Sequence, residues 1–242
     1  YLGNPYENIY PEGDAVYARN VWDLQYFEDK IFIGAGNSSN KGPASNAGPL
    51  VITCYDLRSG LFMTEGPVAE EQIDAFRVLD HRLYIPGHDP TQSWKFGNFY
   101  RRNRNGTWDK YRNISEGLHN YDMAWFKGSL YAALGTADGG AIIRSVDQGQ
   151  TWNVIHAGKN RMYSFLQVND TLYSASKFAT EHTDGRYSGK DIIRAIAEKI
   201  SSFLQMNKSL LGKGKFYAKD SESRNTSRYG IAEITESSQA IP

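Results

Sequence analysis

Three aspartates stand at the beginning of apolar segments that recur along the chain. Asp23, Asp74 and Asp122 each directly follow an aromatic or β-branched residue. If these segments are strands that converge on one axis, the three carboxylates face a common channel. Carboxylates at close range suit calcium or magnesium, or raise the pKa of one member for acid catalysis. The alternative is structural, with each carboxylate accepting a hydrogen bond from the backbone of a neighbouring repeat.

The segment at residues 88–94 carries the richest mixture of polar and aromatic side chains. Its sequence, HDPTQSW, combines a titratable His-Asp pair, hydroxyl groups and a tryptophan. A tryptophan face stacks on the C–H groups of a sugar ring, while Asp, His and Gln hydrogen-bond its hydroxyls. Other segments are expected to lie at the same end of the fold as this loop. The candidate ligand-binding residues are His88, Asp89, Trp94, His119, Tyr121 and His182.

Motifs of the common cofactor-dependent enzymes do not occur in the sequence. It contains no His-x-x-x-His, Cys-x-x-Cys, phosphate-binding loop, nucleophile elbow or dinucleotide fingerprint. The single cysteine, Cys54, lies in an apolar run, so we expect a buried thiol without a chemical role. Metalloenzyme, kinase and dehydrogenase classes are therefore disfavoured. We expect no cofactor, with Ca²⁺ as the one ion that the aspartates could hold.

Charge and hydropathy limit the partners. Lys plus Arg and Asp plus Glu each number 27, so the zero net charge offers no excess of positive charge for nucleic acid. No apolar run approaches the roughly 20 residues of a membrane span, so we expect no membrane insertion. The sequence leaves the oligomeric state open. Six Asn-x-Ser/Thr sequons favour an exported protein, extracellular or at the cell surface, or periplasmic in a bacterium: Asn37, Asn105, Asn113, Asn169, Asn207 and Asn225.

A strand–turn–strand pattern recurs four times and organises the chain. Each copy has an apolar strand, a short polar turn and an apolar-aromatic pair that opens a second strand, as in a β-hairpin. Propeller blades have periods of about 40 to 50 residues. The sequence therefore predicts an all-β propeller. The pairs lie 52, 47 and 42 residues apart: Ile31-Phe32, Leu83-Tyr84, Leu130-Tyr131 and Leu172-Tyr173.

The two ends of the chain determine the predicted number of blades. SFLQMNKSL, residues 202–210, repeats SFLQVNDTL, residues 164–172, and predicts a fifth hairpin; an amphipathic helix over residues 192–199 is the alternative. Residues 191–195 are the predicted third strand of the fourth blade, and Tyr229–Ile234 that of the fifth. Residues 14–18 form a short strand that would close the last blade. We expect one domain over residues 1–242 with about five four-stranded blades, at residues 20–64, 72–112, 119–156, 161–198 and 200–242 with 14–18.

The sequence SVDQGQTW, residues 145–152, forms the turn between the third and fourth strands of the third repeat. Asp147 can accept backbone N–H bonds across the turn, Gly149 can supply a positive φ, and Trp152 can pack between blades. The segment resembles the Asp-box, the Ser/Thr-x-Asp-x-Gly-x-Thr-Trp signature of BNR-type, sialidase-like β-propellers, and residues 103–108 hold a worn copy. The resemblance implies fold rather than activity. It also implies that these turns lie on the face opposite the ligand site.

The loops that follow the second strands are long and would gather on that opposite face as a binding surface. One hypothesis is an extracellular module that recognises a glycan or glycoprotein through this long-loop face. The other is a glycoside hydrolase, sialidase-like or acting through axial carboxylates, with Asp74 and Asp122 as the catalytic pair and Asp23 supporting them. The arginine triad of sialidases has no convincing counterpart in this sequence.

Overall fold

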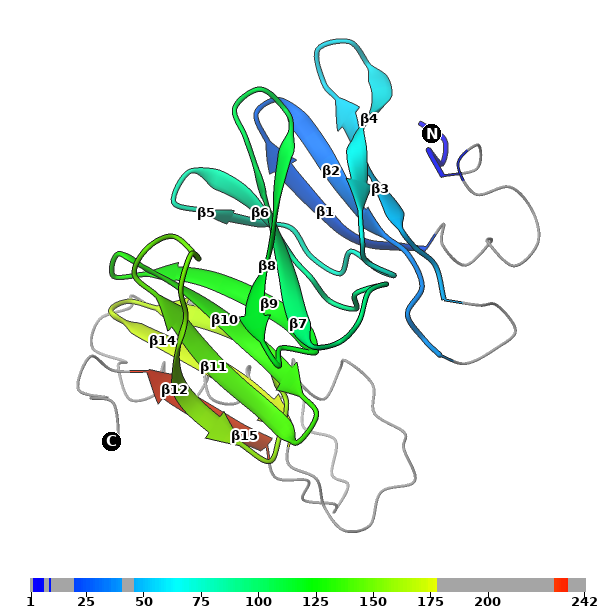
Figure 1. The fold of residues 1–242 in the computed structure, drawn as a ribbon. Helices are drawn as coiled ribbons and strands as arrows, with labels where there is room; N and C mark the ends of the chain where they lie inside the picture. Colours follow the sequence, from blue (N-terminus) through cyan, green and yellow to red (C-terminus); the bar gives the residue numbers. More distant parts are fainter. Residues whose placement is uncertain (1, 7–8, 10–19, 41–45, 178–228, 235–242) are drawn as a thin grey trace, which may run out of the picture.

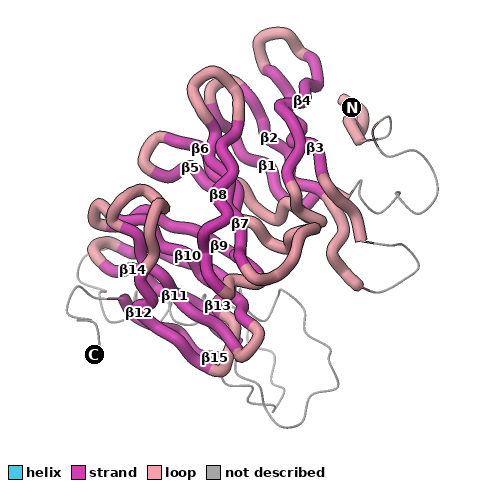
Figure 2. The backbone as a smooth tube through the Cα atoms, viewed as in Figure 1, coloured by secondary structure: helices cyan, strands magenta, loops and turns pink. Residues whose placement is uncertain are grey.

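The structure, a computed structural model, describes residues 2–6, 9, 20–40, 46–177 and 229–234. These residues form fifteen β-strands in four antiparallel sheets, and no helix occurs among them (Figure 1, Figure 2). The prediction of an all-β fold is confirmed for this part of the chain. It contains no helix long and apolar enough to cross a membrane.

Each sheet is built mainly from strands that follow one another along the chain. The first sheet contains β1 (Val21–Phe27), β2 (Lys30–Ala35), β3 (Leu50–Asp56) and β4 (Leu61–Val68). The second contains β5 (Arg77–Leu79), β6 (Arg82–Pro86), β7 (Phe96–Arg102) and β8 (Trp108–Ser115). The third contains β9 (His119–Phe126), β10 (Ser129–Thr136), β11 (Gly139–Ser145) and β12 (Asn153–Gly158). The fourth contains β13 (Met162–Val168), β14 (Thr171–Lys177) and β15 (Tyr229–Ile234).

Tight polar turns join the first two strands of the sheets, as the sequence predicts. Backbone φ is 48° at Glu28 and 58° at Asp29 in the first sheet, and 45° at Lys127 and 73° at Gly128 in the third. Two consecutive left-handed residues match the right-handed twist of the flanking strands. The turns therefore fix the register that buries the leucines opening the second strands, which are 0% exposed: Leu83, Leu130 and Leu172.

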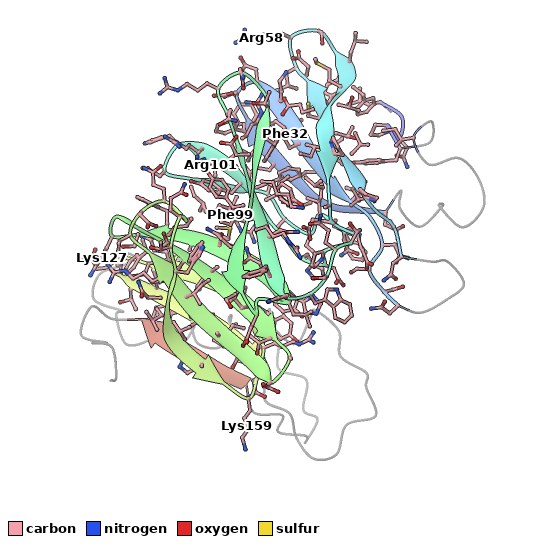
Figure 3. All side chains as sticks on the ribbon, in the orientation of Figure 1. Phe32, Arg58, Phe99, Arg101, Lys127 and Lys159 are labelled. Atoms are coloured by element: carbon pink, nitrogen blue, oxygen red, sulfur yellow. The ribbon has the colours of Figure 1, made fainter. Side chains whose placement is uncertain are left out.

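Consecutive sheets pack face to face through three apolar clusters. Phe32 of the first sheet packs with Phe76 and Ile85 of the second, and Phe99 of the second packs with Leu130 of the third. The third cluster joins the third and fourth sheets through Tyr131, Ile142, Met162 and Leu172. Phe32 and Phe99 lie between neighbouring sheets in Figure 3. This succession of stacked antiparallel sheets fits a propeller-like arrangement.

The sheets present two different ends. The hairpin turns β1–β2, β3–β4, β7–β8 and β11–β12 lie at one end, which we call the turn end, and the segments that connect second to third strands lie at the other, the loop end (Figure 1). Arg58 and Lys127 mark the turn end and Lys159 marks the loop end (Figure 3). The connections from second to third strands are long in the first and second sheets, at residues 36–49 and 87–95. In the third sheet the prediction of a long loop at residues 135–140 is wrong, because Thr136 pairs with Gly139 across a two-residue turn.

The turn between β11 and β12 has the contacts predicted from its sequence. The Thr151 N–H donates to Asp147 Oδ1 over 2.9 Å, and the Thr151 hydroxyl donates to Asp147 Oδ2 over 2.6 Å. Gly149 has a φ of 88°, and its N–H donates to Ser145 Oγ over 2.7 Å. The Trp152 ring meets Phe99 of the second sheet edge to face at 5.8 Å. This turn therefore links two neighbouring sheets.

The fourth sheet differs from the prediction in its third strand. Tyr229–Ile234 pairs with β14, with Ala175 opposite Ile231, instead of belonging to a fifth repeat. The prediction failed because loop-closure entropy grows slowly with length, so a chain can return to its sheet after a long excursion. Residues 191–195, the fifth hairpin at 202–210, the alternative helix at 192–199 and the strand at 14–18 lie outside the described residues. The five-blade count and the blade boundaries stay predictions.

The outer face of the first sheet has no sheet packed against it among the described residues. Trp22, Leu24 and Tyr26 are alternate residues of β1 on this face, and they are 52%, 63% and 58% exposed. Tyr6 covers only one end, where its hydroxyl donates to Ile33 O over 2.8 Å. A strand whose apolar residues point outward in alternation is typical of a sheet prepared to pack against another sheet.

Candidate functional site

Five of the predicted site residues meet at the loop end between the second and third sheets. We call Asp74, His88, Asp89, His119 and Tyr121 the histidine cluster. Asp74 precedes β5, His88 and Asp89 follow β6, and His119 and Tyr121 open β9. Asp74, His88 and Asp89 belong to the second predicted repeat and His119 and Tyr121 to the third, and the stacking of the two sheets brings them together.

Asp74 and His88 form a partly buried ion pair. His88 Nδ1 lies 2.5 Å from Asp74 Oδ2, with side chains 16% and 30% exposed respectively. Burial favours the neutral form of both groups, but the hydrogen bond and charge of the partner outweigh it. The pKa of His88 is therefore raised and that of Asp74 is lowered from their usual values. The pair consequently presents a charged imidazole and a charged carboxylate together.

Asp89 and His119 lie next to this pair and are held mainly by backbone contacts. His119 Nδ1 is 2.9 Å from the carbonyl oxygen of His88 and 3.7 Å from Asp89 Oδ1. Burial lowers the pKa of His119, and burial raises the pKa of Asp89. The shifts of these two groups thus run opposite to those of Asp74 and His88.

Tyr121 supplies the aromatic centre of the histidine cluster. Its ring stacks on His119 at 5.4 Å, meets His88 edge to face at 5.2 Å and lies 4.7 Å from the Tyr163 ring. Arg161 Nη1 donates to the Tyr121 hydroxyl over 2.7 Å, so the tyrosine proton stays available for another acceptor. Burial raises the pKa of Tyr121 to about 12. The Tyr121 hydroxyl is thus a neutral donor, and its ring packs against His88, His119 and Tyr163.

Glycine makes room for this arrangement. A Cβ added at Gly135 of β10 would lie 2.9 Å from Tyr121 Cε2 and 3.2 Å from Arg161 Cδ. Both approaches are shorter than ordinary van der Waals contact, and the ring and guanidinium stem would have to move. The placement of Tyr121 and Arg161 therefore depends on the missing side chain at this position.

Glu70 contacts the histidine cluster through the backbone of Asp89. Sequence reasoning missed this residue. Its side chain is 0% exposed, and its carboxylate accepts hydrogen bonds from the Asp89 N–H at 3.1 Å, Asn98 Nδ2 at 2.6 Å and the Tyr100 hydroxyl at 3.0 Å. Burial raises the pKa of Glu70 to about 7. One acid among many in a linker gives no sequence signal. Its role follows only from the fold.

Arg161 and Tyr163 were also missed, although the repeat carries a signal for them. Tyr163 stands nine residues before Leu172, just as Tyr121 stands nine before Leu130. Arg161 precedes Tyr163 by two residues, as His119 precedes Tyr121. Aligning the repeats by their second strands would have predicted that these residues line the same end of the sheets.

Asp23 and Asp122 lie outside the histidine cluster and are engaged by backbone. Asp23 Oδ2 accepts from the Phe76 N–H over 2.7 Å, and Asp122 Oδ2 accepts from the Phe165 N–H over 2.8 Å. Asp122 Oδ1 also accepts from Arg77 Nε over 2.7 Å and from its neighbour's N–H. Each aspartate thus binds the first strand region of the next sheet, which is the structural alternative raised from the sequence. Burial raises the pKa of Asp122 despite these contacts.

The other predicted ligand-binding residues are not part of the cluster. Trp94 is 59% exposed in the second half of its loop, where Ser93 contacts Arg112 of the outer strand β8. His182 lies outside the described residues. No group of three or more His, Cys, Asp or Glu side chains in the described ranges is arranged to hold a metal ion. The calcium prediction concerned Asp23, Asp74 and Asp122. Asp23 and Asp122 bond the backbone of the next sheet, and Asp74 faces His88.

No family model matches this chain, and no curated protein matches it in sequence. Solved structures give partial likenesses. They include the computationally designed Ika8 protein, with 13% identity, TM-score 0.40 and coverage of 65% of this chain and 43% of that chain. The N-terminal domain of Nup159 has 9% identity, TM-score 0.43 and coverage of 70% and 42%. The α-L-arabinofuranosidase CtGH43 from Clostridium thermocellum has 13% identity, TM-score 0.40 and coverage of 73% and 61%.

In each of these three alignments the chain covers less than two thirds of the other protein's length. At TM-scores of 0.40 to 0.43 the likenesses carry no argument about ligand or activity. The interpretation of the site therefore depends on its own geometry.

Proposed function

We propose that the chain is a β-propeller binding module that recognises a glycan or glycoprotein through its loop end. The observation that carries the proposal is the histidine cluster itself. It combines an ion pair, a second imidazole and a tyrosine hydroxyl around stacked rings. Sugar hydroxyls both donate and accept, and sugar C–H faces pack on aromatic rings, so this mixture suits a carbohydrate better than an apolar ligand.

The alternative glycoside hydrolase has less support. It requires two carboxyl groups with free oxygens on either side of a scissile bond. Both oxygens of Asp122 already accept hydrogen bonds, and one of them faces Arg77. Asp74 is paired with His88. A binding role needs no free catalytic pair, and for this reason we favour it.

The finer fold proposal is a ring of about five blades. The repeat at residues 202–210 matches the hairpin at 164–172, and the outer face of the first sheet exposes Trp22, Leu24 and Tyr26. A further blade against that face would remove this apolar surface from water. The turn at residues 145–152 supports the Asp-box assignment by its sequence and by the bonds of Asp147. The six sequons support an extracellular, cell-surface or periplasmic location.

A glycan panel scored for both retention and product release, with and without calcium, tests the function. We expect retention without release and without a calcium requirement. His119→Gln should weaken the retained glycan about tenfold, the loss typical of an important contact residue. Lys127→Gln at the turn end is the matched control and should leave Kd unchanged. Release of product would favour the hydrolase, and a panel without any retained glycan would refute the proposal.

A further inference from the structure

Trp94 belongs to a second surface, at the outer edge of the second sheet. We call Trp94, Lys95, Lys110 and Arg112 the edge surface. The strand order β5-β6-β7-β8 places β8, which carries Lys110 and Arg112, at the opposite side of the sheet from β5. The histidine cluster instead lies beside the start of β5 and β9. The two halves of one loop thus face two different parts of the molecule.

The loop that carries Trp94 is fixed along both sides. Arg112 Nη2 donates to Ser93 O over 2.6 Å, and Lys110 Nζ donates to Gln92 Oε1. The Glu116 N–H donates to Lys95 O over 3.0 Å. The backbone on either side of the indole is therefore anchored to β8 and to the residues that follow it. A side chain presented from an anchored backbone loses little conformational entropy when it binds a partner.

The edge surface carries three positively charged side chains that take part in no ion pair within the described part of the chain. Lys95, Lys110 and Arg112 form no ion pair with any described carboxylate, whereas Arg58, Arg77, Arg101 and Arg102 all do. Lys110 and Arg112 are alternate residues of β8, so they lie on one face about 7 Å apart. Burial lowers the pKa of Lys110, and the Arg112 charge acts in the same direction, while the Glu70 charge opposes both. Two exposed lysines therefore lie beside the loop that carries the exposed indole, together with Arg112, whose terminal nitrogens donate to Phe96 O, Asn98 Oδ1 and Ser93 O.

We propose that the edge surface binds an anionic polysaccharide, with Trp94 stacking on a sugar ring and the three cations pairing with carboxylate or sulfate groups. Lys95 and Lys110 are exposed cations that flank the loop of Trp94, an arrangement complementary to a linear polymer that carries both sugar rings and repeated negative charges. A protein partner fits less well, because stable protein interfaces need an apolar core of several residues. Trp94 is the only large apolar side chain among those strongly exposed on its loop or on β8. This proposal does not depend on the ligand of the histidine cluster.

The test uses polymers that differ only in charge or backbone. Dextran, dextran sulfate and polygalacturonate of similar length are titrated onto the full chain by biolayer interferometry at low and moderate salt. We expect binding of the sulfated or carboxylated polymer and none of dextran, with affinity falling as salt increases. Binding of one anionic polymer alone identifies the anionic group. Failure of both anionic polymers to bind would overturn the proposal.

Variants separate stacking from charge. Trp94→Ala and the pair Lys95→Gln with Lys110→Gln should each weaken binding about tenfold, because truncating an anchor or removing two charges costs about that much. The pair Lys127→Gln with Lys159→Gln changes net charge equally at distant sites (Figure 3) and should have little effect. Equal losses in the two lysine pairs would reveal a general charge effect and refute the surface.

Two further measurements complete the test. His119→Gln should leave polymer binding unchanged, so failure of the proposed function and failure of this inference are distinguished. Single-stranded DNA is the competing polyanion. Binding of DNA as tightly as the polysaccharide, and equally in Trp94→Ala, would show an electrostatic surface with no sugar recognition and would overturn the proposal.

Discussion

Two neighbouring positions at the beginning of the sheets use aspartate in opposite ways. Trp22, Asp74, Tyr121 and Tyr163 stand nine residues before Ile31, Leu83, Leu130 and Leu172, the second residues of the second strands. Asp23, Ala75, Asp122 and Ser164 stand eight residues before them. Residues of the first set contact loops and rings at the loop end, where Asp74 pairs with His88. Aspartates of the second set bind the backbone of the next sheet.

This difference shows that one step in register changes what a carboxylate can do. Trp22, Tyr121 and Tyr163 stand at β-bulges and Asp74 precedes β5, whereas Asp23 and Asp122 are paired strand residues. A bulge re-aims a side chain, so a shift of one residue moves it from the loop end to the neighbouring sheet. Asp74 therefore resembles Asp23 and Asp122 in the sequence, but it stands one position earlier in its repeat than they do in theirs. We expect Asp122 and Asp23 to affect stability, and Asp74 to affect the site.

The largest expected effect is on the free energy of unfolding, at the aspartates of the second set. Asp122→Ala should lower the free energy of unfolding by about 3 kcal/mol, since it strands a buried backbone N–H and leaves Arg77 without its partner. Asp23→Ala removes one backbone bond and should cost about 1 kcal/mol. Urea denaturation at neutral pH measures both. Equal costs would show that the ion pair with Arg77 adds nothing.

A smaller effect on the free energy of unfolding, dependent on pH, is expected at Asp74 of the first set and its partner His88. The raised pKa of His88 means that its pairing stabilises the fold fully below its usual pKa of 6.5 and fades as pH rises through the raised value. The lowered pKa of Asp74 means that its contribution is present above 3.8 and fades as pH falls. His88→Gln should therefore cost about 1 kcal/mol near pH 5.5 and less near pH 9.

Urea denaturation of the parent protein and His88→Gln at the two pH values gives this difference. Lys127→Gln, an exposed change at the turn end, serves as the control and should behave like the parent at both. A penalty for His88→Gln that is the same at pH 5.5 and pH 9 would contradict the charged pairing with Asp74.

The local elements of the fold were readable from the sequence. The polar turns and the leucines after them predicted the hairpins, and the turn at residues 145–152 predicted the contacts of Asp147 and Trp152. These features depend on residues close together in the chain, where turn chemistry and alternation act directly. The return of Tyr229–Ile234 to the fourth sheet depends on a distant pairing and had no local signal.

The candidate site was predictable in part. His88, Asp89, His119 and Tyr121 were correctly expected to share one mouth, because loops after second strands gather at one end of stacked sheets. Trp94 was grouped with them by its place in the same loop, but the anchoring of that loop to β8 turns it outward. Glu70 was missed because its burial and its contact with Asp89 arise from the meeting of two sheets.

The most direct test of this account measures glycan affinity and unfolding free energy on the same two variants. Asp74→Asn should weaken the glycan retained by the parent protein about tenfold while its stability at neutral pH changes by less than about 1 kcal/mol. Asp122→Ala should lower stability by about 3 kcal/mol while the folded fraction keeps the parent affinity. The reverse pattern, with affinity lost at Asp122 and unchanged at Asp74, would contradict the division between the two positions.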